Sequence, residues 1–401
     1  MIAPEKYNSL PEPMEALAER VEDEILQSIC KRIAQDGYIT ATSEIQISAL
    51  IDRGWSANDL MLKIAQLTDK SFLLIMQMYE NAAEESQRFD EEVYKKLGKK
   101  PVPVEKNERI QAEIKALAEQ THSTFQNFTG SLGFSVNRNG KMEFLPLAKA
   151  YRYILDRAQM EILSGGFTGQ EAIKRAVKDL AASGVKTVSY ASGHVDQLDV
   201  AVRRASVTGL NQIAETMNDQ TLNDFESPLV EVSAHGGARD QGTGWQNHKA
   251  WQGKVYYWKE KDKWNRADLA WKYPDFVSVT GYGQVDGIEG ANCRHSKRVF
   301  VDGVSERMYT DKQLQEIDDP DFEYKGVKYT TYEATQRQRL LERTQRKYKR
   351  VLKAFDSIGV KDTDEDYIAV QSRLEAAKKE YRNFSKAAGL RLQPERARID
   401  Y

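Results

Sequence analysis

Four side chains that can bind metal gather in one glycine-rich part of the sequence. The segment GANCRH (290–295) contains one of the chain's two cysteines and one of its five histidines. Cys293 and His295 are two positions apart, and His235 and His248 lie upstream. Thiolate sulfur and imidazole nitrogen are typical ligands of tetrahedral zinc. Metal binding also supplies folding free energy directly, so these residues could form a structural zinc site.

Two other interpretations fit the same residues. The spacing matches no standard zinc-finger signature, so the histidines could instead hydrogen-bond to loop backbone. A catalytic cluster is the third interpretation, in which the histidines, Arg239 and Lys254 act as acid, base and phosphate clamp of a metal-free nuclease. Cys293 could also be a nucleophile with a histidine base. A nuclease needs a basic cleft, however, and the segment 228–310 mixes acidic and basic residues freely.

The segment that carries these residues, 228–310, is predicted to be a small, loop-rich α+β unit. It contains the short β-like runs PLVEVSAH, GKVYYW, FVSVTGYG and RVFV, together with five of the six tryptophans. Such short strands would supply little core, so we expect something to staple the unit. Trp251 and Trp258 are expected in the core of a small sheet, although a carbohydrate-stacking platform would look similar.

The preceding part of the chain is predicted to be helical. Residues 1–98 form an N-terminal helical region, in which Leu17, Val21, Ile25, Ile29 and Ile33 repeat every four residues. Residues 99–107 form a linker, because two prolines interrupt them. A second helical region covers 108–227 and includes a hairpin around Asn139-Gly140. The run GVKTVSYASGHVD is either a loop or a second small hairpin.

The last region, 311–401, is predicted to be an antiparallel helical hairpin and a tail. Apolar residues follow a 3-4 spacing on both sides of a turn at Gly359, with Leu374 in the middle of the seam. The first helix is strongly basic between 331 and 353, and we expect its cations to remain in solvent. Arg346, Lys347, Lys349 and Arg350 are the candidates for binding DNA phosphates or an acidic protein surface.

Composition bounds the possible classes of protein. The 401 residues carry a formal net charge of -2, so contact with nucleic acid would have to come from local patches. Two cysteines cannot build a disulfide framework. The amino-terminal segment lacks the apolar core of a signal peptide, and no run is long enough to span a membrane. The sequence contains no P-loop, G-x-S-x-G, H-E-x-x-H or C-x-x-C motif. We therefore expect a mainly α protein without a complete enzymatic signature.

Several segments together resemble a known family. AHGGARDQ, NHKAWQGKVYYW, GIEGANCRHS and YEATQRQRLLERTQRKYKR, in this order, are similar to the phage minor capsid protein 2 family of tailed phages and prophages. The opening helices and the closing AAGLRLQPERARI extend the similarity over nearly the whole chain. The middle also resembles, distantly, the Mu-type F head-morphogenesis domain. There a Cys/His-containing unit ends in a C-R-C-like motif, and His295 stands where that domain has its last cysteine.

The resemblance implies a low-copy structural protein of the virion, made in the host cytoplasm and incorporated near the portal during head assembly. The partners implied are the portal protein and the major capsid protein, with the packaged DNA as a further contact. The family name establishes no enzymatic activity. The alternative is an enzyme or toxin-like effector carried in the virion. In the Mu-type domain cysteine pairs are common, and His235 and His248 replace them here, which leaves zinc binding open because histidine can replace cysteine as a ligand.

Overall fold

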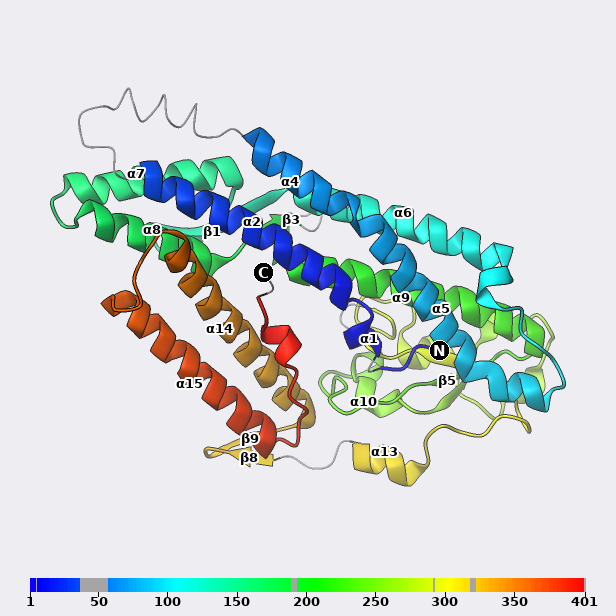
Figure 1. Ribbon diagram of the computed structural model, residues 1–401. Coiled ribbons are helices and arrows are strands. Elements are labelled where there is room, and N and C mark those ends of the chain that lie inside the picture. Colours follow the sequence, from blue (N-terminus) through cyan, green and yellow to red (C-terminus); the bar gives the residue numbers. More distant parts are fainter. Residues whose placement is uncertain (5, 37–56, 189–192, 291–292, 318–321, 400–401) are drawn as a thin grey trace. The chain divides into compact units, whose positions relative to one another are not determined.

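The structure is a computed structural model that describes the whole chain except residues 5, 37–56, 189–192, 291–292, 318–321 and 400–401. It is mainly helical with small antiparallel sheets, as predicted (Figure 1). The chain forms two compact units, each assembled from three separate stretches. The first unit comprises Met1–Met14, Phe72–Ser123 and Arg203–Gln336, and the second comprises Glu15–Ser71, Thr124–Val202 and Arg337–Tyr401.

The described elements follow one another along the chain. The helices are α1 (Lys6–Ser9), α2 (Glu12–Asp36), α4 (Ala57–Asp69), α5 (Ser71–Lys96), α6 (Glu108–Gly130), α7 (Leu147–Leu163), α8 (Gly169–Ser183), α9 (Leu198–Phe225), α10 (His248–Trp251), α11 (Ala267–Ala270), α12 (Phe276–Thr280), α13 (Asp311–Ile317), α14 (Thr331–Ser357) and α15 (Glu365–Ala387). The strands are β1 (Leu132–Arg138), β2 (Lys141–Pro146), β3 (Lys186–Val188), β4 (Val195–Gln197), β5 (Leu229–Val232), β6 (Val255–Tyr257), β7 (Lys297–Phe300), β8 (Phe322–Tyr324) and β9 (Val327–Tyr329). Among the described helices, none combines the length and the apolar composition that a membrane span requires.

In the second unit, the structure contains the apolar helix face and the hairpins that the sequence patterns predict. The five apolar residues that repeat along α2 are all buried. β1 and β2 pair around Asn139 and Gly140, which have φ angles of 52° and 83°. Positive φ at both positions is the requirement of a type I′ turn, and Asn-Gly meets it at little cost. β3 and β4 form the second small hairpin. Within the predicted N-terminal helical region, residues 37–56 lie outside the described residues.

The predicted C-terminal hairpin is present, with α14 and α15 antiparallel (Figure 1). The Gln338 side-chain amide donates to the Ser385 hydroxyl at 2.9 Å, and nearer the turn the Phe355 and Tyr367 rings are 6.3 Å apart. Gly359 has a φ of 75°, which favours glycine in the turn. The seam of α15 is buried as predicted and consists of Val370, Leu374, Ala377, Tyr381 and Phe384.

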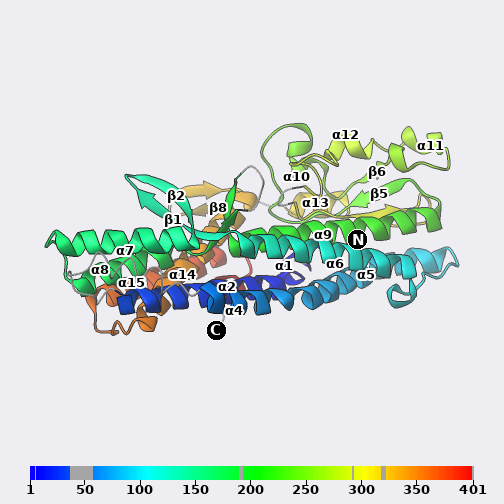
Figure 2. The ribbon, with the colours of Figure 1, turned by 90° about the horizontal axis from the view of Figure 1, so that it is seen from above.

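The first unit contains a three-stranded antiparallel sheet with strand order β6-β5-β7. Figure 2 shows this sheet lying along α9. One strand prediction in this region is wrong, because the first five residues of FVSVTGYG form the short helix α12. Asp275 caps its start by accepting a hydrogen bond from the Ser278 backbone amide, and Gly281 ends it in the left-handed conformation. Caps at both ends thus override the β propensity of the valines. The strands β8 and β9 and the helix α13 were not predicted.

The core of this unit is larger than its short strands alone supply. The sheet packs into a large apolar cluster to which helices from outside the segment contribute. Its buried members are Val93, Tyr94, Leu222, Phe225, Val230, Val232, Trp251, Tyr256, Trp258, Phe276, Ile288, Cys293 and Val299. The first two belong to α5 and the next two to α9, so long helices supply the apolar surface that the short strands lack. Trp251 and Trp258 are core residues, as predicted.

Candidate metal site and basic helix

Three of the four proposed ligands converge on one buried point. The side-chain ligand atoms of His248, Cys293 and His295 all lie within 4.8 Å of one another. The Cys293 sulfur is 3.7 Å from Nδ1 of His248 and 3.5 Å from Nδ1 of His295. Tetrahedral zinc, with bonds of about 2.3 Å to sulfur and about 2.0–2.1 Å to nitrogen, separates two such ligand atoms by about 3.5 Å. The sulfur–nitrogen distances therefore fit a shared metal ion.

Two different segments bring these ligands together. His248 opens the short helix α10, whose start is capped by Asn247. Cys293 and His295 come from the loop between α12 and β7, whose described residues, 281–290 and 293–296, we call the ligand loop. This loop turns tightly enough that glycine is required: a Cβ at Gly287 would lie 1.9 Å from the Gly281 carbonyl oxygen. The glycines that surround GANCRH in the sequence thus shape the loop that presents the ligands.

Hydrogen bonds orient both imidazoles. Nε2 of His248 lies 2.8 Å from the backbone carbonyl oxygen of Asp286, and Nε2 of His295 lies 3.0 Å from Oε1 of Gln252. The backbone amide of His235 also donates to this Oε1, which identifies the atom as oxygen. In a neutral imidazole, a hydrogen on Nε2 leaves a lone pair on Nδ1. Both Nδ1 lone pairs therefore face the Cys293 sulfur, an arrangement common in metal sites.

The electrostatics of the site keep the histidines neutral. Burial, together with nearby positive groups, lowers the pKa of His295 well below its usual value, and burial also lowers the pKa of His248. Burial raises the pKa of the Cys293 thiol to about 11. A thiol carries one hydrogen and can satisfy only one of the two Nδ1 atoms that face it. Hydrogen bonding thus accounts for both Nε2 atoms but for only one Nδ1.

The fourth predicted ligand, His235, does not join this group. Its ring stacks on that of His295, with centroids 4.4 Å apart and planes inclined by 28°. Its Nδ1 lies 3.0 Å from the Gly236 carbonyl oxygen and 3.4 Å from a nitrogen of Arg294. No ring nitrogen of His235 belongs to the group of ligand atoms that lie within 4.8 Å of one another.

The residues proposed for a catalytic cluster have structural contacts. The Arg239 guanidinium donates to the Asp286 carbonyl oxygen at 3.1 Å, and the Lys254 ammonium donates to the Ala250 carbonyl oxygen at 2.7 Å. His248, Cys293 and His295 are each at most 3% exposed. A thiol with a pKa near 11 is also a poor nucleophile at neutral pH.

The sequence did not predict the roles of Gln252 and Asp286, two residues that orient the ligands. Gln252 follows α10 directly, and Asp286 lies in the ligand loop. The Asp286 carboxylate accepts hydrogen bonds from the side chains of Trp245 and Gln246, while its backbone carbonyl orients His248. A contact through a backbone carbonyl leaves no trace in residue type, so this role could not be predicted. Gln252 offered only a weak signal, its closeness to His248 in the sequence.

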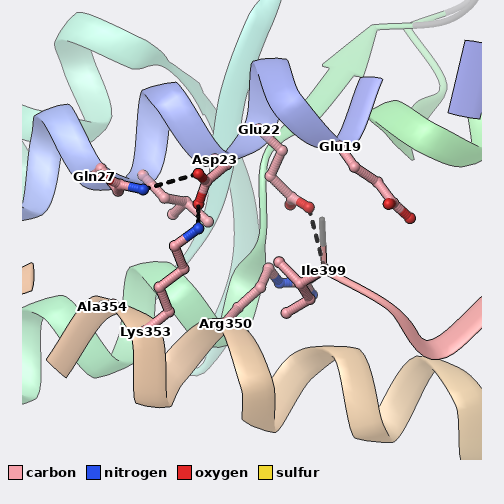
Figure 3. A pocket seen from close by; sticks show the side chains of 9 residues that line it. Glu19, Glu22, Asp23, Gln27, Arg350, Lys353, Ala354 and Ile399 are labelled. Atoms are coloured by element: carbon pink, nitrogen blue, oxygen red, sulfur yellow. Dashed lines mark hydrogen bonds and ion pairs between the residues drawn. The ribbon is translucent and has the colours of Figure 1, made fainter. Parts of the chain in front are cut away.

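The expectation that the basic face of α14 stays in solvent is wrong for two of the four named residues. The side chains of Arg346 and Arg350 are only 15% and 10% exposed. Arg346 forms ion pairs with Asp199 and Glu19. Figure 3 shows the neighbouring pairs between α14 and α2, in which Arg350 reaches Glu22.

The remaining cations of this face differ in their surroundings. Lys353 pairs with Asp23 at 2.6 Å, next to Gln27. These three side chains, together with Glu22 and Arg350, line a pocket between α2 and α14 (Figure 3). Lys349 donates to the Ala397 carbonyl oxygen, and Lys347 is exposed. Ion pairing therefore directs much of the basic run inward, toward acidic residues of α2.

Comparisons with known proteins identify the family. The model of the family "Phage minor capsid protein 2" matches residues 2–386. A curated relative described as "Structural protein", from Lactococcus phage LL-H, is 27% identical over 276 residues, which cover 68% of this chain and 67% of the relative. No solved structure shows significant similarity to the chain. The match over nearly the whole sequence shows that this chain belongs to the phage minor capsid protein 2 family.

Proposed function

We propose that this protein is a structural component of the head of a tailed phage or prophage, incorporated near the portal during assembly. The observation that carries the proposal is the family match over residues 2–386. A relative described as a structural protein supports it. The portal protein and the major capsid protein are the proposed partners, with packaged DNA as a further contact.

We also propose that His248, Cys293 and His295 bind one structural zinc ion. Their donor types, their sulfur–nitrogen distances and the Nε2 hydrogen bonds that turn both Nδ1 atoms toward Cys293 support this. Bound zinc would replace the thiol hydrogen and join α10 to the ligand loop. A structural zinc takes four ligands, and a rotated His235 is the proposed fourth.

Burial favours a structural ion over the rival enzyme. A catalytic zinc keeps one position open to water or substrate, whereas all three converging side chains are at most 3% exposed. The two basic side chains suggested for a nuclease are engaged with backbone carbonyls. The site thus has the character of a cross-link within the first unit.

We also propose that α14 contacts DNA or a protein partner. The ion pairs with α2 reduce the number of its cations that are available for this contact. Of the four residues named for it, Arg346 and Arg350 face acidic residues of α2, and Lys347 is the exposed one. Arg343, one helical turn before Lys347, is also exposed. These two cations therefore replace the full set as the residues to test first.

A mass-spectrometric inventory of purified, DNA-filled particles tests the proposed location. We expect the protein in the particles at a low copy number relative to the major capsid protein. Its presence in host lysate together with its absence from particles would contradict the proposal.

Elemental analysis tests the zinc site. We expect about one zinc per chain after purification without chelator, and we expect its loss in Cys293→Ser. Cys30→Ser is the matched control, because Cys30 is the other buried cysteine and lies in the second unit. His235→Ala tests whether His235 is the fourth ligand. If it is, this variant should bind zinc more weakly; if only three residues bind zinc, its zinc affinity should not change. A wild-type protein that contains no zinc as purified, takes up none when zinc is added and is equally stable would leave only the hydrogen-bonded interpretation.

A further inference from the structure

A buried ion pair brackets the two ligands of the ligand loop. The Lys297 ammonium lies 2.6 Å from the Glu289 carboxylate, and the two side chains are 0% and 6% exposed. Glu289 precedes Cys293 by four residues, and Lys297 follows His295 by two. The pair therefore joins the two ends of the stretch that presents a sulfur and a nitrogen to the proposed metal.

The lysine side of this pair is held by an aromatic cage. The Lys297 nitrogen lies 5.1 Å from the ring centroid of Trp258, 5.9 Å from that of Phe276 and 4.6 Å from that of Tyr282. Aromatic faces attract a cation within about 6 Å, and more strongly where water is excluded. The ammonium thus has a defined position inside the core.

Helix α9 fastens the same two ends through the backbone. The Asn211 side-chain amide donates to the Glu289 carbonyl oxygen at 3.1 Å, and the Asn218 side-chain amide donates to the Lys297 carbonyl oxygen at 3.0 Å. Seven residues separate the two asparagines, so they lie on one face of α9. Each end of the ligand-bearing stretch is therefore held twice, by the ion pair and by the helix.

Stability alone is a weak reason for such a pair. Replacing a buried ion pair by apolar side chains of similar volume is often neutral or stabilising, because burying two charges is costly. In some proteins buried charges instead fix one conformation. In this chain, the conformation that the pair could fix is the approach of Cys293 and His295 to His248.

We infer that the Lys297–Glu289 ion pair is a positioning clamp that holds the ligand loop in metal-binding geometry, although neither residue is a ligand. The inference rests on the proposed zinc site. Outer contacts that orient ligands commonly change metal affinity by about 10–100-fold when they are removed. Loss of the clamp should therefore weaken zinc binding without removing any ligand.

The test compares zinc affinity and stability in variants of the full chain. Lys297→Met/Glu289→Met removes both charges while roughly keeping side-chain volume. We expect it to fold with near wild-type resistance to urea but to bind zinc about 10–100-fold more weakly in competition with a chromogenic chelator. Lys272→Met is the control, because Lys272 forms an exposed pair with Asp302 and should leave the affinity unchanged.

A second measurement separates failure of the clamp from failure of the zinc proposal. In metal-free protein, the backbone amides of Cys293 and His295 should exchange hydrogen faster in the double variant than in the wild type. A folded double variant with wild-type zinc affinity overturns the clamp while leaving the zinc site intact. Wild-type protein that binds no zinc overturns the zinc proposal. If wild-type protein binds no zinc and the double variant shows wild-type amide exchange at Cys293 and His295, the clamp is overturned as well. If these amides exchange faster in the double variant, the ion pair still orders the loop.

Discussion

Replacing Arg346 by methionine should destabilise the second unit, whereas the same replacement of its neighbour Lys347 should not. The Arg346 side chain is 15% exposed and pairs with Asp199 and Glu19. Burial alone would lower the pKa of Arg346, but these carboxylates outweigh it and raise that pKa. Removing one partner of a buried ion pair typically costs about 3–5 kcal/mol, because the remaining charge is left unpaired. A substitution at an exposed position changes stability by about 0.5 kcal/mol or less.

Differential scanning calorimetry measures the difference between the two variants. In a unit of this size, about 3–5 kcal/mol corresponds to a fall in melting temperature of about 6–20 °C. Adding Asp199→Leu to Arg346→Met should recover part of the loss, since it removes a carboxylate left without its cation. The assignment of Arg346 to an internal ion-pair network is refuted if Arg346→Met has the melting temperature of the wild type. It is also refuted if Lys347→Met lowers the melting temperature as much as Arg346→Met does.

Three further predictions concern the core and the acid limit of stability. Leu374→Asp should cost several kcal/mol in urea unfolding, because it puts a carboxylate into the buried hairpin seam, whereas Ile368→Asp, at a 47% exposed position of the same helix, should cost little. Gly209→Ala should lower the melting temperature, since a Cβ would lie 1.7 Å from the Tyr79 hydroxyl oxygen; a wild-type melting temperature would contradict that packing. Burial alone would raise the pKa of Asp199, but its guanidinium partner outweighs burial and lowers that pKa, so its contribution to the unfolding free energy should persist down to about pH 4 and be lost at lower pH. Urea titrations between pH 6 and pH 3 check this, and Asp199→Asn should show a flatter decline.

Local patterns in the sequence determined most helices and hairpins. The four-residue repeat along α2, the 3-4 spacing around Gly359 and the Asn139-Gly140 turn each specify their element through interactions within a few residues. The presence of Cys293 and His295 in one glycine-rich loop likewise indicated a candidate site before any contact was known. Such signals survive in sequence because they depend on neighbours along the chain.

The tertiary structure alone decided which distant groups meet. Two compact units are interleaved along the chain, and α5 and α9 complete the core of the small sheet. Arg346 turned inward because acidic residues far away in sequence face it. Among the four predicted ligands, His248 joined Cys293 and His295, whereas His235 stacked beside them. Ion pairs, second-sphere hydrogen bonds and shared cores depend on the path of the whole chain, and residue type and local spacing carry no record of that path.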